Sequence, residues 1–415
     1  MSHRAGCFLS VRAPLASARA IVFVLPTAFL TLLPGSLSGQ ELRGRVFAES
    51  RIFPGDPAFT GQRHSTVSPS FGLEPELLWE NGAGNLQITI EPFLRVDAHD
   101  GSRTHFDLRQ ANAVYFSDGW TMLAGFGKVF WGKTEANHLV DIINQTDGVE
   151  DIDTEDKLGQ PMVNFTLERD WGAIDFFFLP YFRERSFAGS RGRLRGQLPV
   201  LDEAVYESDA GRWHPDFAVR WSYFAGEFDV GVSAFRGTSR EPLLVPVTVG
   251  LSSTLQPRYD IIDQLSIDVQ WTRGPTLWKL EAMTRGGHGD RFAAAVAGVE
   301  HTFFQVGGGT SDLGVLGEVM VDRRDENAPF SAFDHDLFFG VRWALNDTYD
   351  TSILGGPVID YETGEMIALL EAERRIRNSW VAEFEARILL NTDASAPLSG
   401  LRRDDFLTLR LSRYF

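Results

Sequence analysis

Acidic side chains gather in one segment, residues 132–160, and carboxylates in such number could hold a divalent cation. The segment contains Asp141, Asp147, Glu150, Asp151, Asp153, Glu155 and Asp156. The alternate spacing of Asp151, Asp153 and Glu155 is typical of the start of a calcium loop, because hard cations take several carboxylate oxygens. The glycine that such a loop needs at its sixth position is missing, as is the distal glutamate. We therefore expect no metal site in this segment.

A second segment, residues 185–212, carries basic side chains. Arg185, Arg191, Arg193 and Arg195 follow Arg183 and are separated by glycines. Such a run could bind the phosphates of lipopolysaccharide, pair with the acidic segment, or attract anionic solutes through its local field. It could also be a charged loop without a ligand.

The sequence contains no motif of a known catalytic site. It has no G-x-S-x-G, no H-E-x-x-H and no P-loop, and its nine histidines form no metal-binding spacing. The single cysteine is Cys7, near the start of the chain. We expect neither an enzyme nor a bound cofactor.

Segments of alternating polarity recur along the chain and must position these loops. In 86–97, the apolar residues Leu86, Ile88 and Ile90 alternate with Gln87 and Thr89. The same pattern recurs in 174–183, 217–223, 264–271, 336–343 and 380–388. In a membrane, this period of two separates lipid-facing from lumen-facing side chains, and a charge on the lipid side costs about 2–4 kcal/mol at mid-depth. A soluble β-sandwich is the main alternative for the same pattern.

One segment does not fit this pattern. If Phe106 and Leu108 face the lipid together with Val114, strict alternation also turns Gln110 and Asn112 outward. Either another part of the protein covers that face, or the register of this strand is different from the expected one.

The connections between these segments are alternately short and long. Short ones are expected at 81–85, 117–119, 170–172, 225–227, 273–276, 307–312, 346–350 and 377–379. Most of the others are long, at 50–67, 132–160, 185–212, 237–257, 324–332 and 391–404. Outer-membrane barrels have short periplasmic turns and long external loops. We predict a single all-β domain, an antiparallel transmembrane barrel of about 18 strands with about 16 as the alternative, and both termini in the periplasm.

Residues 1–39 have the features of a cleaved secretory signal. Arg4, Arg12 and Arg19 precede an apolar run from Ala20 to Leu33, and small residues follow. Cleavage would remove three arginines and no acidic residue, which takes the formal net charge from −17 to −20. This charge argues against nucleic-acid partners. Residues 40–415 then form the barrel domain.

Two short motifs carry a resemblance to known families. Leu407, Leu409 and Leu411 lead to a terminal Phe415, which resembles the last strand of Gram-negative outer-membrane proteins. There, that strand is read by the barrel assembly machinery, although Arg413 stands here where an aromatic residue is usual. The stretch 125–132, followed by Asn144, resembles porin-like and alginate-export-like barrels, in which a strand ending in Trp-Gly leads into a long loop.

The functional expectation is an outer-membrane channel for passive diffusion or export of small or anionic hydrophilic solutes. Rings of charged side chains set the selectivity of a pore, and the expected pore-lining residues are Glu91, Arg95, Asp107, Arg109, Arg183, Arg220, Arg342, Glu383 and Arg387. The acidic segment, with Asp141, Asp147, Asp151 and Asp153, would fold inward as a constriction. The alternatives are a non-conducting structural or adhesive barrel and a transporter of hydrophobic compounds. Expected partners are outer-membrane lipid, lipopolysaccharide and the assembly machinery.

Overall fold

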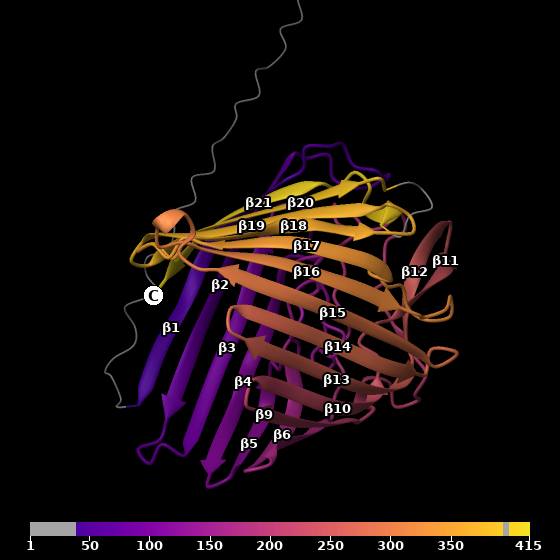
Figure 1. Cartoon of the computed structure of the whole chain (residues 1–415). Coiled ribbons are helices and arrows are strands. Elements are labelled where there is room, and N and C mark those ends of the chain that lie inside the picture. The colour runs from indigo at the N-terminus through magenta and orange to yellow at the C-terminus, as the bar shows by residue number, and fades with distance from the viewer. Residues whose placement is uncertain (1–38, 393–397) are drawn as a thin grey trace, which may run out of the picture. The chain divides into compact units, whose positions relative to one another are not determined.

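The computed structural model describes residues 39–392 and 398–415, and this part of the chain forms a closed barrel of 18 antiparallel strands (Figure 1). Each strand pairs with the next one along the chain, and β1 pairs with β21 to complete the ring. The expected all-β barrel of about 18 strands is confirmed, and the alternative count of about 16 is wrong. The predicted signal peptide lies outside the described residues, apart from Gly39.

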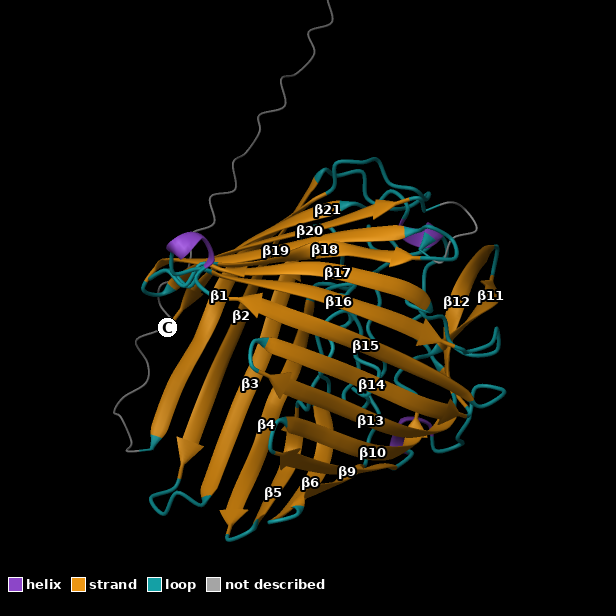
Figure 2. Ribbon diagram, viewed as in Figure 1, coloured by secondary structure: helices purple, strands orange, loops and turns teal. Residues whose placement is uncertain are grey.

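The strands of the barrel are β1 (Gln40–Ile52), β2 (Val67–Glu80), β3 (Leu86–Asp97), β4 (His105–Ser117), β5 (Trp120–Gly127), β6 (Gln160–Arg169), β7 (Gly172–Leu179), β9 (Asp216–Ala225), β10 (Phe228–Thr238), β13 (Ile261–Arg273), β14 (Thr276–Gly286), β15 (Phe292–Phe303), β16 (Asp312–Asp322), β17 (His335–Ala344), β18 (Ser352–Asp360), β19 (Met366–Arg377), β20 (Trp380–Leu390) and β21 (Phe406–Tyr414). The predicted short connections all lie at one end of the barrel, where both β1 begins and β21 ends. The long ones lie at the other end, which is called the outer end below (Figure 2).

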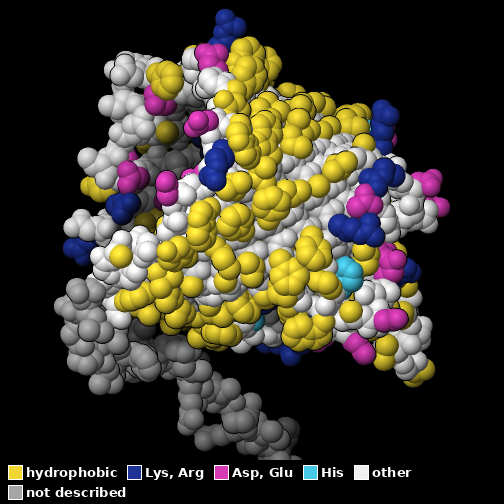
Figure 3. All heavy atoms as spheres, turned by 90° about the horizontal axis from the view of Figure 1, so that it is seen from below, with side chains coloured by type: hydrophobic (Ala, Val, Ile, Leu, Met, Phe, Trp, Pro, Cys, Tyr) yellow, Lys and Arg dark blue, Asp and Glu magenta, His cyan; other side chains and the backbone are white. Residues whose placement is uncertain are grey.

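Apolar side chains cover the outside of the wall. Ile90, Leu94, Phe217, Leu265 and Val341, all assigned to the lipid side by the alternating pattern, are exposed. Figure 3 shows hydrophobic side chains over this surface, with charged ones gathered toward its edges. An exposed apolar band of this kind is stable only against lipid, so the alternation marks the membrane-spanning part of each strand.

Aromatic side chains form a belt near the short turns. Phe228 stacks on Trp271 with ring centroids 5.6 Å apart, and Trp271 lies 6.4 Å from Trp278. Tyr115 and Trp120 make a similar pair at 5.5 Å on β4 and β5. Aromatic rings suit the boundary between hydrocarbon and water, because they combine an apolar body with a polarisable edge. The belt therefore marks one border of the membrane.

The unusual segment on β4 is explained by its register. Glu91 pairs with Gln110 while Pro92 pairs with Leu108, so Arg109 is an extra residue on β4. A β-bulge of this kind shifts the alternation by one residue. The Gln110 side chain donates to the inward Glu91 at 2.6 Å, and Asn112 is buried. Of the two explanations given for this segment, the different register is confirmed.

A small second sheet lies among the outer loops. It contains β8 (Val205–Tyr206), β11 (Leu243–Val249) and β12 (Ser252–Tyr259). Three 3-10 turns occur among the described residues: η2 (Gly211–Trp213), η3 (Val306–Gly308) and η4 (Ser399–Leu401). In the described part of the chain, no helix has both the length and the apolar character to cross a membrane.

Candidate functional site: the lumen and its loop

The connection between β5 and β6, residues 128–159, contacts the inner wall on several sides and is called the lumenal loop below. Asn144 holds its two ends together and is almost fully buried. Its side-chain amide donates to the carbonyls of Gly127 and Leu158 at 2.9 Å each, and its carbonyl accepts from the Val129 amide at 2.8 Å. One side chain thus satisfies three backbone groups at the neck of the loop.

Apolar contacts attach the lumenal loop to one half of the wall. Trp131, Val140, Ile142 and Ile143 pack against wall side chains of β6, β7, β9, β10 and β13, such as Phe177. Leu139 packs against a second cluster on β14 to β18. Both clusters are buried, and close-packed apolar side chains leave no room for water. The lumenal loop is thus packed tightly against this half of the wall.

Two wall glutamates fix the backbone of the loop beside these clusters. Glu281 on β14 accepts from the amides of Lys133 and Thr134 at 2.6 and 3.1 Å and from the Thr134 hydroxyl at 2.7 Å. Glu318 on β16 accepts from the amides of Glu135 and Ala136 at 2.8 and 2.9 Å. Each carboxylate satisfies backbone donors that would otherwise be buried without partners.

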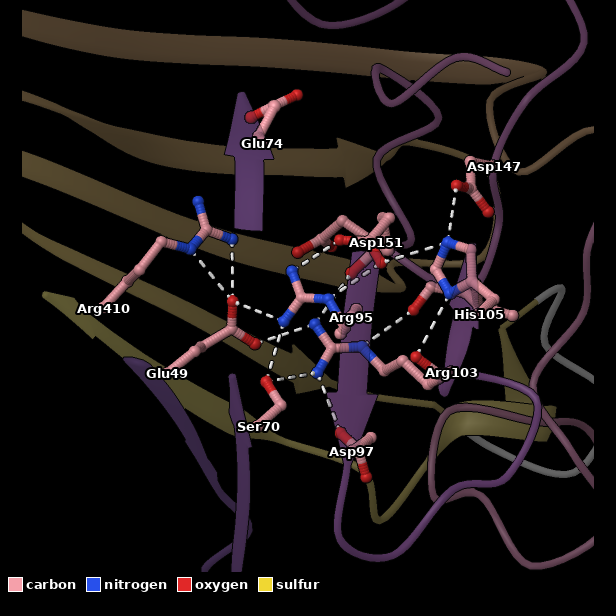
Figure 4. A network of polar contacts seen from close by, with 12 residues as sticks. Glu49, Ser70, Glu74, Arg95, Asp97, Arg103, His105, Asp147, Asp151 and Arg410 are labelled. Carbon is pink, nitrogen blue, oxygen red and sulfur yellow. Dashed lines mark hydrogen bonds and ion pairs between the residues drawn. The ribbon is translucent and has the colours of Figure 1, made fainter. Parts of the chain in front are cut away.

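The opposite half of the barrel carries an arginine cluster, defined by four guanidinium groups around the buried Glu49. Arg51, Arg95 and Arg410 lie on wall strands and Arg103 lies in the connection between β3 and β4. Figure 4 labels Arg95, Arg103 and Arg410 beside Glu49. Arg103 and Arg410 reach the Glu49 carboxylate at 2.7 and 2.8 Å, Arg95 at 3.1 Å and Arg51 at 3.7 Å. The Phe47 ring lies beneath three of the inward arginines, Arg45, Arg95 and Arg410, at 4.9 to 5.4 Å from its centroid. Cation–π contacts of this kind hold guanidinium groups in place without neutralising them.

The lumenal loop supplies further carboxylates to this half of the wall. Glu150 makes a two-pronged contact with Arg95 at 2.9 and 2.5 Å, and Asp151 lies 3.2 Å from Arg51. Asp147 accepts from Arg109 at 2.7 Å. The carboxylates of the acidic segment therefore pair with arginines on the inner side of the barrel wall.

A polar cavity of about 320 Å³ lies between the lumenal loop and β1 to β4 and β21. Its charged lining consists of Arg45, Arg95, Arg109, Lys128, Lys157, Arg410, Glu74, Glu150, Glu155 and Asp156. Basic groups outnumber acidic ones, although the whole chain has a net charge of −17. A small pocket of about 40 Å³ lies on the outer side of the arginine cluster, lined by Arg51 and Arg103 among others.

Burial changes the protonation of several loop carboxylates. It raises the pKa of Asp156 to about 6, and the nearby Glu150 adds to this rise. Burial also raises the pKa of Asp153, with Asp151 beside it. Burial acts in the same direction on Asp147, but its bonds to His105 and Arg109 hold its pKa well below the usual range. Asp147 is therefore charged at neutral pH, whereas Asp156 titrates near it.

One group of potential metal ligands occurs among the described residues. His105, Asp147 and Glu150 bring one ligand atom each within 4.8 Å of the others. Both carboxylates already bind arginines, at 2.7 Å from Arg109 and 2.5 Å from Arg95. A cation placed here would lie close to two guanidinium charges, so the group is better suited to its present ion pairs.

The expected pore-lining side chains all have polar partners on the wall's inner side or on the lumenal loop. These partners are Gln110 for Glu91, Glu150 for Arg95, Arg109 and Arg183 for Asp107, Asp147 for Arg109, Asp268 for Arg220, Glu135 for Arg342, Arg410 for Glu383, and Glu371 for Arg387. Arg183 lies beyond the end of β7, in the loop that follows it. Of the expected constriction residues, Asp141 pairs with Lys157 and Asp153 with Arg387.

Sequence reasoning missed the centre of the arginine cluster. Arg51 falls within the expected connection 50–67, and neither Glu49 nor Arg410 is among the expected pore-lining residues. The signal was present, because Arg45, Phe47, Glu49 and Arg51 follow one another at every second position. Phe47 and Phe93 also face inward, and Phe93 lies on the polar face that the alternation in 86–97 predicts.

The basic segment contributes to a cover over the outer end. Arg193 is buried and donates to Asp404 at 2.8 Å and to the Gly55 carbonyl at 3.0 Å. Arg195 donates to the carbonyls of Ser190 and Thr60 at 2.8 and 3.0 Å. These bonds join the loop after β7 to the loops after β1 and β20. In these positions the two arginines stabilise contacts between loops and do not pair with the acidic segment.

Together, the closed antiparallel ring, the apolar outer band, the aromatic belt and the charged interior define a porin-like β-barrel of the outer-membrane type. No protein-family model matches the chain, and neither does any curated protein. Among solved structures, the chain is similar to a loop-deletion mutant of OmpT, an outer membrane protein of Vibrio cholerae. The identity is 10%, 91% of this chain and 99% of that chain are covered, and the TM-score is 0.45. A mutant of the Rh. blastica porin is similar at 11% identity, with 91% and 100% covered and a TM-score of 0.42.

Proposed function

We propose that the protein is a channel for passive diffusion of small hydrophilic solutes, with a preference for anions. The observation that carries this proposal is the polar cavity of about 320 Å³ beside the lumenal loop, in which basic groups are in excess. Apolar packing closes the other half of the lumen. Solutes would therefore pass along β1 to β4 and β21, and the lumenal loop would narrow this path.

The interior chemistry favours a channel over the other readings. A transporter of hydrophobic compounds would need an apolar pocket, whereas guanidinium and carboxylate groups line the cavity. No reaction is proposed, because the wall arginines described above are held in ion pairs, as Arg95 is with Glu150 and Arg109 with Asp147. The cavity volume suits small solutes, either entering or exported. Both termini would lie in the periplasm, at the end with short turns.

A non-conducting barrel is the second candidate, and one observation favours it. The outer loops joined through Arg193 and Asp404 cover the mouth, and the lumenal loop lies beneath them. Under this reading the outer surface is the working part of the protein. Exposed basic residues there, such as Arg191 and Arg402, would contact lipopolysaccharide phosphates.

Conductance in a planar bilayer distinguishes the two candidates. The protein, refolded without residues 1–39, is inserted and its current recorded across a tenfold gradient of KCl. Stable steps with a reversal potential on the anion side are expected. Folding is checked independently by the shift in electrophoretic mobility on heating. A folded barrel without current would reject the channel and leave the non-conducting barrel.

A further inference from the structure

The lumenal loop separates two cavities on the polar side of the lumen. Gly148 and Val149 line the small outer pocket, whereas Glu150 lines the large inner cavity. Arg103 donates to the Val149 carbonyl at 3.0 Å, and Arg51 donates to the Glu150 carbonyl. Residues 147–151 and the arginine cluster thus form the partition between the two spaces.

The barrel wall supplies too few carboxylates to neutralise all four arginines of the cluster. Arg103 has a second wall carboxylate in Asp97 at 3.0 Å, and Arg410 has one in Glu383 at 3.3 Å. Arg51 and Arg95 share only Glu49 with the others. Their remaining carboxylates, Asp151 and Glu150, come from the lumenal loop. A buried guanidinium group without a counter-ion is costly, so these two positions require an anion from outside the wall.

We propose that Arg95 and Arg51 form a binding site for the carboxylate or phosphate group of a permeating solute, which Glu150 occupies in the solute-free protein. Arg95 presents two parallel N–H groups to Glu150, a geometry that fits any planar or tetrahedral oxyanion. The Nε of Arg51 is buried and has no hydrogen-bond partner. It faces the Glu49 carboxylate at 3.7 Å and adds to the positive charge of the site.

Exchange of one anion for another would open the partition. A solute oxyanion that replaces Glu150 on Arg95 keeps that guanidinium neutralised, so Glu150 can leave without exposing a buried charge, while Asp147 and Asp151 keep their pairs with Arg109 and Arg51. The Glu150 side chain would then move away from the arginine cluster and widen the passage between the two spaces. This inference rests on the proposed channel function and gives it a substrate class, solutes with a carboxylate or phosphate group.

The test compares Glu150→Gln with Glu74→Gln in the full barrel. Both changes remove one carboxylate from the lining of the same cavity, but Glu74 pairs with Arg45 at 2.7 Å, outside the partition. The half-saturating concentration for current is measured with acetate and, separately, with inorganic phosphate. Because Glu150→Gln removes the competing internal anion, this concentration should fall about tenfold relative to the unmodified protein. Glu74→Gln should change it by less than about twofold, through the general field alone.

The two anions distinguish the carboxylate from the phosphate source, since the one that saturates at lower concentration identifies the preferred group. Equal effects of Glu150→Gln and Glu74→Gln would overturn the site and leave the channel intact. Absence of current in every folded variant would instead reject the channel function.

If Glu150→Gln does not fold, the proposal can still be tested by a spin-label measurement on a protein that keeps Glu150. The only native cysteine is Cys7, in the predicted signal, so a spin label at Thr154→Cys reports on the exposed tip of the lumenal loop. Acetate or phosphate should increase the label's mobility, and Arg95→Lys, which loses the two-pronged contact, should weaken that response. If neither anion changed the mobility of the label, the proposed exchange of Glu150 for a solute anion would be contradicted.

Discussion

Glu281 on β14 accepts three hydrogen bonds from Lys133 and Thr134 of the lumenal loop through a single carboxylate oxygen. Its other oxygen accepts from the Val140 amide at 3.3 Å. The carboxylate is fully buried and comes from the wall opposite the arginine cluster. The lumenal loop is therefore held from both sides of the barrel, by an acidic residue on one side and basic residues on the other.

We predict that Glu281→Ala releases this side of the loop. Four backbone or hydroxyl donors lose their acceptor, and each unsatisfied buried donor costs about 1–3 kcal/mol before relaxation, so a net loss of about 3 kcal/mol is expected. Urea unfolding in detergent, followed by tryptophan fluorescence, measures this loss. Single-channel recordings should show larger and noisier currents. Glu281→Gln keeps an acceptor oxygen and should lose less than half as much, and an equal loss in both variants would contradict this explanation.

The arginine cluster depends on a residue without a side chain. Gly72 on β2 pairs with Phe47 on β1, and a methyl group at Gly72 would lie 2.1 Å from the Phe47 ring. Gly72→Ala must therefore push the ring away, and with it the guanidinium groups that lie on it. Overpacking of this kind costs about 1–3 kcal/mol.

The matched control for Gly72→Ala is Gly317→Ala on β16, where an added methyl group meets no atom within 4 Å. Urea unfolding should show a loss for Gly72→Ala and almost none for Gly317→Ala. In a salt gradient, Gly72→Ala should also shift the reversal potential toward zero, because the inward arginines lose their support. Comparable stability of the two variants would show that Phe47 adapts without cost.

Anion preference should increase as the pH falls through about 6. Burial raises the pKa of Asp156 to about 6, so this cavity carboxylate is charged at pH 7.5 and largely neutral at pH 5. Its protonation adds one net positive charge to a cavity in which basic groups are already in excess. The reversal potential in a KCl gradient should therefore move toward the anion side between these pH values.

Asp156→Asn separates this effect from other titrations. At pH 7.5 the variant should already show the anion preference that the unmodified protein shows at pH 5. Most of the pH dependence of its reversal potential should be lost. A variant that retains the full pH shift would place the responsible group elsewhere, with Glu155 and Asp153 as the next residues to change, because burial raises the pKa of both.

The barrel could be predicted from the sequence because the alternation that defines its strands involves only neighbouring residues. Lipid on one side and water on the other impose a period of two, and strands such as 86–97 carry that period in their own residues. The bulge at Arg109 is visible in the sequence only as a break in the alternation, and its position depends on how β3 and β4 align. The site depends on longer distances. Asp147 meets Arg109, 38 residues away, and Glu150 meets Arg95, 55 residues away. Such pairs are set by the path of the lumenal loop across the lumen, which no local pattern encodes.

The C-terminal residue closes the barrel and offers a test of the resemblance in the last strand. Phe415 donates to the Gly44 carbonyl at 3.0 Å and accepts from the Gly44 amide at 3.1 Å, so it forms the last pair between β21 and β1. Deletion of Phe415 removes this pair and should cost about 1–2 kcal/mol, which a barrel of 18 strands can tolerate. Refolding into lipid vesicles should therefore remain efficient.

In Gram-negative cells, deletion of Phe415 should impair assembly more than it impairs refolding into vesicles if the assembly machinery recognises the terminal aromatic residue. We expect the deletion variant to accumulate poorly in outer-membrane fractions, whereas Phe415→Tyr, which keeps the ring and both backbone bonds, should assemble normally. Heat-modifiable mobility measures the folded fraction in both settings. Equal losses in vesicles and in cells would assign Phe415 a purely structural role, since a recognition signal affects only the assembly that depends on the machinery.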